Sequence, residues 1–233
     1  MIGAGKKLYQ IGFIVGDPLS VNDRNKYTDQ QSYEKHVILL KDAFLQEATQ
    51  VSKEDAKTVT TGAHYLEDKS EFDIKRNYVS NNVGSFTKDG VTYHIVADEA
   101  EARDVFFQYL GDKEIQTLFG YNNQSRDIST YELNTDDFWL DKDARFKTIM
   151  QSKDNIDIRL QMADSIYSKE LEGYVRDSLD YYRKHGIITS TRTAHDALSD
   201  IEDTLALYKT IANSRFDSKD MFNEEENELT DTT

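Results

Sequence analysis

The sequence predicts an α/β fold, in which a mixed or parallel sheet is flanked by helices. Three consecutive segments carry this prediction: a β-rich run at Val91–Ala97, a helical run that ends at Gly111, and a second β-rich run at Glu114–Tyr121. A strand, a helix and a strand in this order are typical of layered α/β domains. Beyond Tyr121 the periodicity of apolar residues becomes helical, so helices are expected to cover the sheet.

The composition predicts one folded domain with a short acidic tail. The chain has 233 residues, of which 38% are hydrophobic and 11% aromatic, enough for a substantial core. We expect residues 1–215 to form a single domain and residues 216–233 to be a disordered tail, because Glu224–Asp231 contains five acidic residues and little apolar content. The absence of cysteine excludes disulfides, thiolate metal sites and a cysteine nucleophile, and it suits a reducing cytoplasm.

The net charge of −15 argues against a broad surface that binds nucleic acid, since such surfaces depend on clustered lysine and arginine. It leaves open a small cleft in which divalent metals meet a phosphate. No apolar run approaches the roughly 20 residues that span a bilayer. We therefore expect a cytoplasmic protein without a membrane partner, and a protein partner could bind the acidic tail.

The first half of the chain is predicted to contain a strand and a long helix. Leu8–Val15 is β-rich and ends at a turn that begins with Gly16. Thr28–Thr49 has apolar residues at three- and four-residue spacings, which predicts a helix with one buried face. The region Thr58–Lys88 is polar and irregular, and it yields no predicted element.

Capping signals define the helices of the second half. Asp98 with Glu101 is predicted to cap the helix after Val91–Ala97. Thr193 is predicted to cap the last helix, which would place His195 in its first turn. The four predicted helices that follow Tyr121 are Ala144–Met150, Asn155–Tyr167, Glu170–His185 and Arg192–Lys209.

Two short motifs carry residues that could perform chemistry. "AHDALSD" places His195 five residues before Asp200, a plausible general base beside a metal ligand, although an ordinary surface helix would also explain it. "GYNNQSRD" places Asp127 after a predicted strand, at the sheet edge where α/β proteins usually bind ligands. A simple helix cap would also explain Asp127.

Together, in this order, the motifs resemble those of the DnaQ-like (DEDDh) 3′–5′ exonucleases, and of the bacterial exonuclease I branch in particular. "GYNN…D" resembles the second motif of that branch, and "AHDALSDIEDTLALYK" resembles its third. The segment "LDYYRKHGI" resembles the helix and loop before the third motif. The similarity extends from Ala100 to Ile211, and Leu8–Asp17 resembles the second strand of the family. It implies an RNase H-like mixed sheet flanked by helices.

The resemblance also implies roles for individual residues. Asp127 and Asp200 would hold two Mg²⁺ or Mn²⁺ ions on the scissile phosphate of single-stranded nucleic acid, DNA rather than RNA. His195 would take the proton from the attacking water, as suits an imidazole near neutral pH. Asn122 and Asn123 would shape the turn or contact substrate. Asp157 falls where the family often has an acidic helix.

The sequence departs from the family at two points. The family begins with a strand that carries Asp-x-Glu, the other two carboxylates of the metal site, and the printed chain contains no such strand, so we expect it before Met1. Arg126 replaces an apolar residue and could contact a phosphate. Two interpretations follow: a shortened record of an active exonuclease, which we favour, or an inactive relative that binds nucleic acid or protein. A chance match of the motifs is the third.

Overall fold

The computed structural model describes the chain in separate stretches, and the motif residues of the sequence fall partly between them. The described residues are 10–16, 33–42, 45, 70–121, 140, 143–162, 167–168, 173–174, 179–184, 186, 188 and 196–211. The predicted acidic tail lies outside them.

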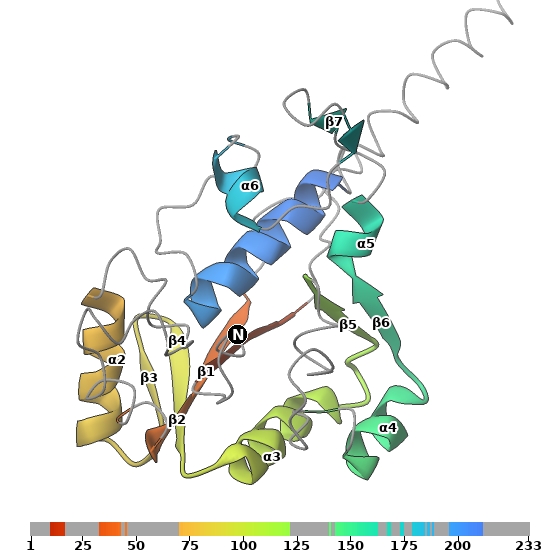
Figure 1. Ribbon diagram of the computed structural model, residues 1–233. Helices are drawn as coiled ribbons and strands as arrows, with labels where there is room; N and C mark the ends of the chain where they lie inside the picture. Colours follow the sequence, from red (N-terminus) through yellow and green to blue (C-terminus); the bar gives the residue numbers. More distant parts are fainter. Residues whose placement is uncertain are drawn as a thin grey trace, which may run out of the picture.

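A four-stranded mixed sheet forms the centre of the fold. β1 (Gln10–Val15) pairs antiparallel with β2 (Glu34–Leu40), and β2 pairs parallel with β4 (Val91–Val96). β3 (Gly84–Lys88) pairs antiparallel with β4, which gives the strand order β1-β2-β4-β3. The structure thus confirms the predicted α/β class and a sheet with both strand directions (Figure 1).

Helices cover both faces of this sheet. Alternate residues of a strand point to opposite faces, and in β2 both sets are buried. Ile38 and Leu40 belong to the core cluster that includes α3 (Glu99–Leu110). Val37 and Leu39 belong to the cluster that includes α2 (Ser70–Asn81) and the helix over residues 197–211. Figure 1 shows α3 and this last helix on opposite sides of β1. The sheet is therefore the middle of three layers.

A second, smaller sheet lies beside the first. β5 (Thr117–Gly120) pairs parallel with β6 (Asp154–Asp157), in a sheet separate from that of β1. The remaining elements are α4 (Ala144–Met150), α5 (Ile158–Met162), β7 (Tyr167–Ser168), β8 (Gly173–Tyr174) and α6 (Leu179–Lys184). No helix in the described ranges is long and apolar enough to cross a membrane.

The predicted helix Thr28–Thr49 is wrong where the structure has β2. Glu34–Leu40 contains a continuous apolar run, and such a run fits helical spacing because every position is apolar. Central strands covered on both faces have this pattern. Two further helix predictions are wrong in part. Asn155–Tyr167 overlaps strands β6 and β7, and Glu170–His185 overlaps β8, although its described residues Leu179–Lys184 are helical.

The region without a prediction contains α2 and β3. The turn between β3 and β4 is formed by Asp89 and Gly90, which have φ angles of 51° and 77°. Positive φ at both central residues is typical of the type I′ turn, and Asp-Gly is one of its preferred sequences. The Asp-Gly dipeptide could have predicted this hairpin, but the polar and irregular sequence before it gave no sign of the first strand.

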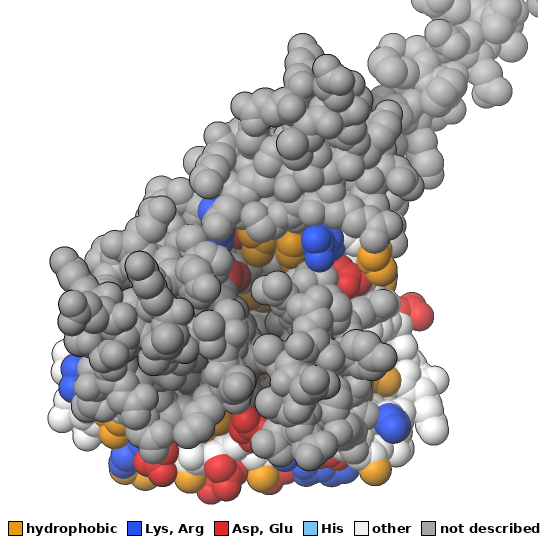
Figure 2. All heavy atoms as spheres, in the orientation of Figure 1, with side chains coloured by type: hydrophobic (Ala, Val, Ile, Leu, Met, Phe, Trp, Pro, Cys, Tyr) orange, Lys and Arg blue, Asp and Glu red, His pale blue; other side chains and the backbone are white. Residues whose placement is uncertain are grey.

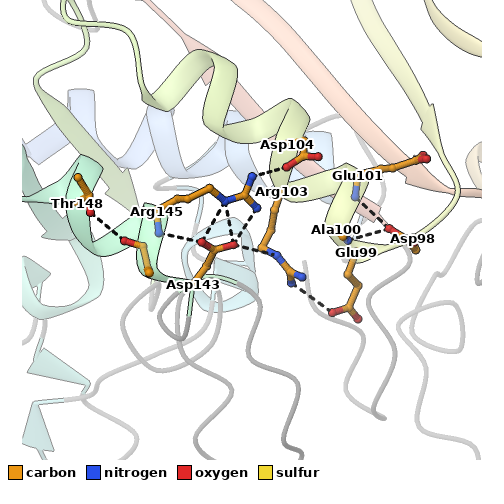
Figure 3. A network of polar contacts seen from close by, with 10 residues as sticks. Asp98, Glu99, Ala100, Glu101, Arg103, Asp104, Asp143, Arg145 and Thr148 are labelled. Atoms are coloured by element: carbon orange, nitrogen blue, oxygen red, sulfur yellow. Dashed lines mark hydrogen bonds and ion pairs between the residues drawn. The ribbon is translucent and has the colours of Figure 1, made fainter.

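The predicted cap of α3 is confirmed, and with the cap of α4 it belongs to one polar network (Figure 3). The Asp98 carboxylate accepts hydrogen bonds from the backbone N–H groups of Ala100 and Glu101, at 2.9 and 3.0 Å. Asp143 caps α4 through the N–H of Arg145, at 2.8 Å, and lies 3.5 Å from the Arg103 guanidinium of α3. Hydrogen bonds from Arg145 lower the pKa of Asp143, which favours its charged form.

Candidate functional site

Strand β5 and the helix over residues 197–211 come together near the end of β5. The rings of Phe119 and Tyr208 lie 4.8 Å apart, and those of Tyr121 and Tyr182 lie 6.2 Å apart. All four side chains belong to one apolar cluster. The strand that leads into "GYNN…D" and the helix that follows His195 are therefore neighbours, although about 80 residues separate them in sequence.

The last helix begins at residue 197, later than predicted. Asp196 is its cap: one carboxylate oxygen accepts the N–H groups of Leu198 and Ser199, at 3.1 and 3.2 Å. The prediction that Thr193 caps this helix and that His195 lies in its first turn is therefore wrong. An aspartate that accepts two N–H groups is a better cap here because its charge also favours the helix N-terminus.

Five of the six predicted site residues lie outside the described residues. They are Asn122, Asn123, Arg126, Asp127 and His195. Asp200 is described, and so is Asp157, whose position at the end of β6 is opposite Gly120 in the register of the small sheet. Asp157 is buried and accepts the N–H of Arg159 at 3.1 Å, so it lies at a strand end rather than within the predicted helix.

Asp200 accepts a hydrogen bond from a guanidinium. Arg183, on α6, donates to Asp200 at 2.9 Å and also donates to Asp203, one turn further along the helix. Burial lowers the pKa of Arg183, but the hydrogen bonds and charges of Asp200 and Asp203 raise it more, so the net shift is upward. The guanidinium therefore neutralises part of the negative charge that a divalent cation would otherwise meet.

The described residues alone do not fit a site for two divalent cations. Within them, no three His, Asp or Glu side chains are grouped as metal ligands, and Asp200 is the one expected ligand among them. Two cations on a phosphate need several bridging carboxylates. One carboxylate oxygen of Asp200 and one of Asp203 instead bind Arg183.

Sequence reasoning missed a buried ion pair beside this helix. Lys75, on α2, donates to the Asp196 carboxylate and, at 3.2 Å, to the side-chain oxygen of Gln10 on β1. The side chains of Lys75 and Asp196 are only 2% and 6% exposed. A buried charge is stable only with a partner, so this pair fixes how α2, β1 and the last helix meet. The sequence did not indicate that Lys75 is buried, because lysine side chains usually face solvent.

Two buried histidines form a polar chain across the sheet. His36 on β2 and His94 on β4 face each other at 3.2 Å, Ser85 on β3 lies 2.8 Å from His94, and Glu34 lies 3.5 Å from His36. A carboxylate next to His36 Nε2 favours the proton on that atom, so His94 Nε2 donates to His36 Nδ1 and Ser85 donates to His94 Nδ1. Both rings are then neutral, as the burial of each requires.

The histidine pair predicts a loss of stability in mild acid. Burial, and then the nearby His36, lower the pKa of His94 to about 4, whereas an unfolded histidine titrates near 6.5. The contribution of neutral His94 to the stability of the fold is complete above pH 6.5. It is lost as the pH falls toward 4, because in this range His94 binds a proton in the unfolded chain but not in the folded one. We expect a decrease of about 2 kcal/mol in the free energy of unfolding over this range.

Urea denaturation at several pH values measures this change, and His94→Gln is its control. The variant should be less stable at pH 7 but should lose less stability between pH 6.5 and 4, since glutamine does not titrate. If both proteins lose the same free energy of unfolding between pH 6.5 and 4, the acid sensitivity belongs to other groups.

Figure 2 shows acidic and basic side chains side by side along the lower edge of the molecule, among the described residues. Comparison of the chain with protein-family models, with curated proteins and with solved structures finds no match in any of the three.

Proposed function

We propose that the protein is a metal-dependent 3′–5′ exonuclease that hydrolyses single-stranded DNA on an RNase H-like fold. The contact between β5 and the helix over residues 197–211 carries the proposal. It brings the strand before "GYNN…D" next to the helix after "AHD", as a shared site requires. Asp157 lies at the end of the neighbouring strand β6, opposite Gly120.

The sequence motifs supply the proposed roles. His195 accepts the proton of the attacking water, and Asp127 and Asp200 provide carboxylates for Mg²⁺ or Mn²⁺, which would neutralise charge on the phosphate. Asn122, Asn123 and Arg126 contact the substrate or shape the turn that holds Asp127. Arg183 releases Asp200 in this scheme and remains paired with Asp203.

The second candidate is a non-catalytic relative that binds nucleic acid or protein. The ion pair between Arg183 and Asp200 favours it, because a guanidinium already satisfies the carboxylate that a metal would need. In that case the helix over residues 197–211 is a structural support, and its acidic residues stabilise α6.

A nuclease assay separates the two candidates. Single-stranded DNA labelled at its 5′ end is incubated with the full chain and Mg²⁺ or Mn²⁺, and the products are resolved by length. A 3′–5′ exonuclease shortens the strand stepwise from the unlabelled end. Asp200→Asn and His195→Ala should each reduce the rate by about 100-fold or more, since loss of a general base alone typically has this effect.

Glu202→Gln is the matched control. It removes a carboxylate of the same helix that pairs with Lys35, without changing a proposed metal ligand or a partner of Arg183, so it should retain most of the rate. Degradation by none of the proteins at any metal concentration would reject the exonuclease. Binding of labelled DNA without degradation, equal in all variants, would support the non-catalytic candidate.

A further inference from the structure

The polar chain across the four-stranded sheet ends at a serine that solvent can reach. Ser85 on β3 is exposed, whereas His94 and His36 behind it are buried. The Ser85 hydroxyl lies 2.8 Å from His94 Nδ1, and His94 Nε2 lies 3.2 Å from His36 Nδ1. Together with Glu34, these residues form what we call the serine chain.

Glu34 sets the direction of the hydrogen bonds in the serine chain. Its carboxylate lies 3.5 Å from His36 Nε2 and favours a proton on that nitrogen. His36 Nδ1 therefore accepts from His94, and His94 Nδ1 accepts from the Ser85 hydroxyl. A hydroxyl, a base within hydrogen-bond distance of it and a third group that orients the base are the arrangement that activates a serine as a nucleophile.

Aromatic packing holds both imidazole rings in place. Phe13 of β1 stacks on His36, with ring centroids 4.8 Å apart. Tyr109 of α3 lies against both histidines, with centroids 4.4 Å from His36 and 6.0 Å from His94. Because His94 is already fixed in orientation, little freedom remains to be lost when it takes part in a reaction.

The backbone of β3 places a second donor beside the hydroxyl. The two-residue turn Asp89–Gly90 makes Lys88 and Val91 a hydrogen-bonded pair, and such pairs alternate with non-hydrogen-bonded pairs along an antiparallel ladder. Three residues before Lys88, Ser85 and His94 form a non-hydrogen-bonded pair, so the Ser85 N–H points away from β4. A substrate oxygen at this N–H would lie beside Ser85 Oγ, where negative charge develops when an ester is attacked.

We propose that Ser85 is the nucleophile of an ester-hydrolysing site, with His94 as its general base. Ser85 Oγ attacks the carbonyl carbon of the ester while His94 Nδ1 takes the hydroxyl proton, and this proton then passes to the leaving alkoxide. Water releases the acyl group from Ser85, and its proton returns through His94 to Oγ. The products are a carboxylic acid and an alcohol. The proposal does not depend on nuclease activity.

The surroundings of His94 indicate the class of ester. Burial, and then the nearby His36, lower the pKa of His94 to about 4. The neutral base is therefore fully present at neutral pH, but it is a weak base. A weak base and a serine open to solvent are suited to esters with a good leaving group and a small acyl group, such as aryl acetates, rather than to amides.

Labelling of the full chain with a fluorophosphonate tests the nucleophile. In this reaction Oγ bonds to phosphorus, fluoride leaves and the hydroxyl proton goes to the base. We expect a single label on the folded protein, located at Ser85 by mass spectrometry of peptides, and no label in concentrated urea. The folded protein should also hydrolyse para-nitrophenyl acetate, which releases coloured nitrophenolate.

Thr87→Ala is the matched control for Ser85→Ala. Both hydroxyls lie on the same face of β3, but Thr87 lies 3.2 Å from the hydroxyl of Thr92 instead of a histidine. Ser85→Ala should abolish labelling and ester hydrolysis, and Thr87→Ala should retain both. His94→Gln should slow labelling by about 100-fold or more, the usual contribution of a general base.

The pH dependence of labelling separates His94 from other bases and needs no variant. With its pKa of about 4, His94 should support the same rate at about pH 5.5 as at pH 7. A base with the ordinary histidine pKa of about 6.5 would instead slow labelling about tenfold between these pH values.

Three results would overturn the proposal. The first is the absence of label on the folded protein. The second is a label that persists in Ser85→Ala, which would assign the reaction to another residue. The third is a tenfold loss of rate between about pH 7 and pH 5.5, which would assign the base to a histidine with an ordinary pKa.

Discussion

Replacement of Asp196 by asparagine is expected to lower the free energy of unfolding by about 3 to 5 kcal/mol, the usual result of leaving one charge of a buried pair without its partner. Asparagine has nearly the same shape and is an equally good helix cap, so the N–H groups of Leu198 and Ser199 keep an acceptor. The loss therefore reports the uncompensated ammonium of Lys75. Urea denaturation at neutral pH measures it.

Two companion variants separate the ion pair from its surroundings. Lys75→Met should cost less than Asp196→Asn, because the Asp196 carboxylate retains two backbone donors and the favourable end of a helix dipole. The double variant should be more stable than Asp196→Asn alone, since it removes the buried charge that has lost its partner. Additive losses in the double variant would show that the two side chains do not interact.

Replacement of Gly12 by alanine is expected to cost about 2 to 3 kcal/mol, the range of an overpacked core. A Cβ atom at this position would lie 2.4 Å from the carbonyl oxygen of Ala197 and 2.6 Å from its carbonyl carbon. Both are backbone atoms, so the contact cannot be relieved by a side-chain rotation. The strand and the first turn of the last helix would have to separate. The midpoint and slope of urea denaturation measure the effect.

Gly90→Asn is the control for this substitution. Gly90 has a φ of 77°, but no atom of the described residues lies within 4 Å of the place that a Cβ would take, and asparagine tolerates such backbone angles. A loss of about 1 kcal/mol at most is expected there. If Gly12→Ala is tolerated as well as Gly90→Asn, the close approach of β1 to the last helix is not a constraint on the fold.

Local signals were sufficient where the sequence and its immediate neighbours determine the structure. Asp98 marks the first turn of α3, β-rich composition marks β4, and the predicted bounds of α4 are those of the structure. The α/β class could be predicted from these elements. β2 could not be identified, because its apolar run is shaped by burial on both faces, and only the partners β1 and β4 make it a strand.

In the candidate site, too, local features were predictable from the sequence and tertiary contacts were not. The apolar face of the last helix was predictable from its periodicity, and Leu198 is buried as expected of such a face. The partners of its acidic residues were not predictable, because Lys75 and Arg183 are brought to Asp196 and Asp200 by tertiary packing. A sequence pattern can place a carboxylate on a helix, but it cannot show which cationic side chain the fold brings beside it.

The hairpin of β3 and β4 has a consequence for the order in which the chain folds. Its Asp89–Gly90 turn joins strands that are adjacent in sequence, and α3 follows β4 directly, so these contacts need little loop closure. The parallel pairing of β2 with β4 must instead enclose residues 41–90, and it gains nothing until both strands are aligned. The hairpin is thus the part of the sheet that we expect to form first, and β2 and β1, whose antiparallel pairing encloses only residues 16–33, add to it.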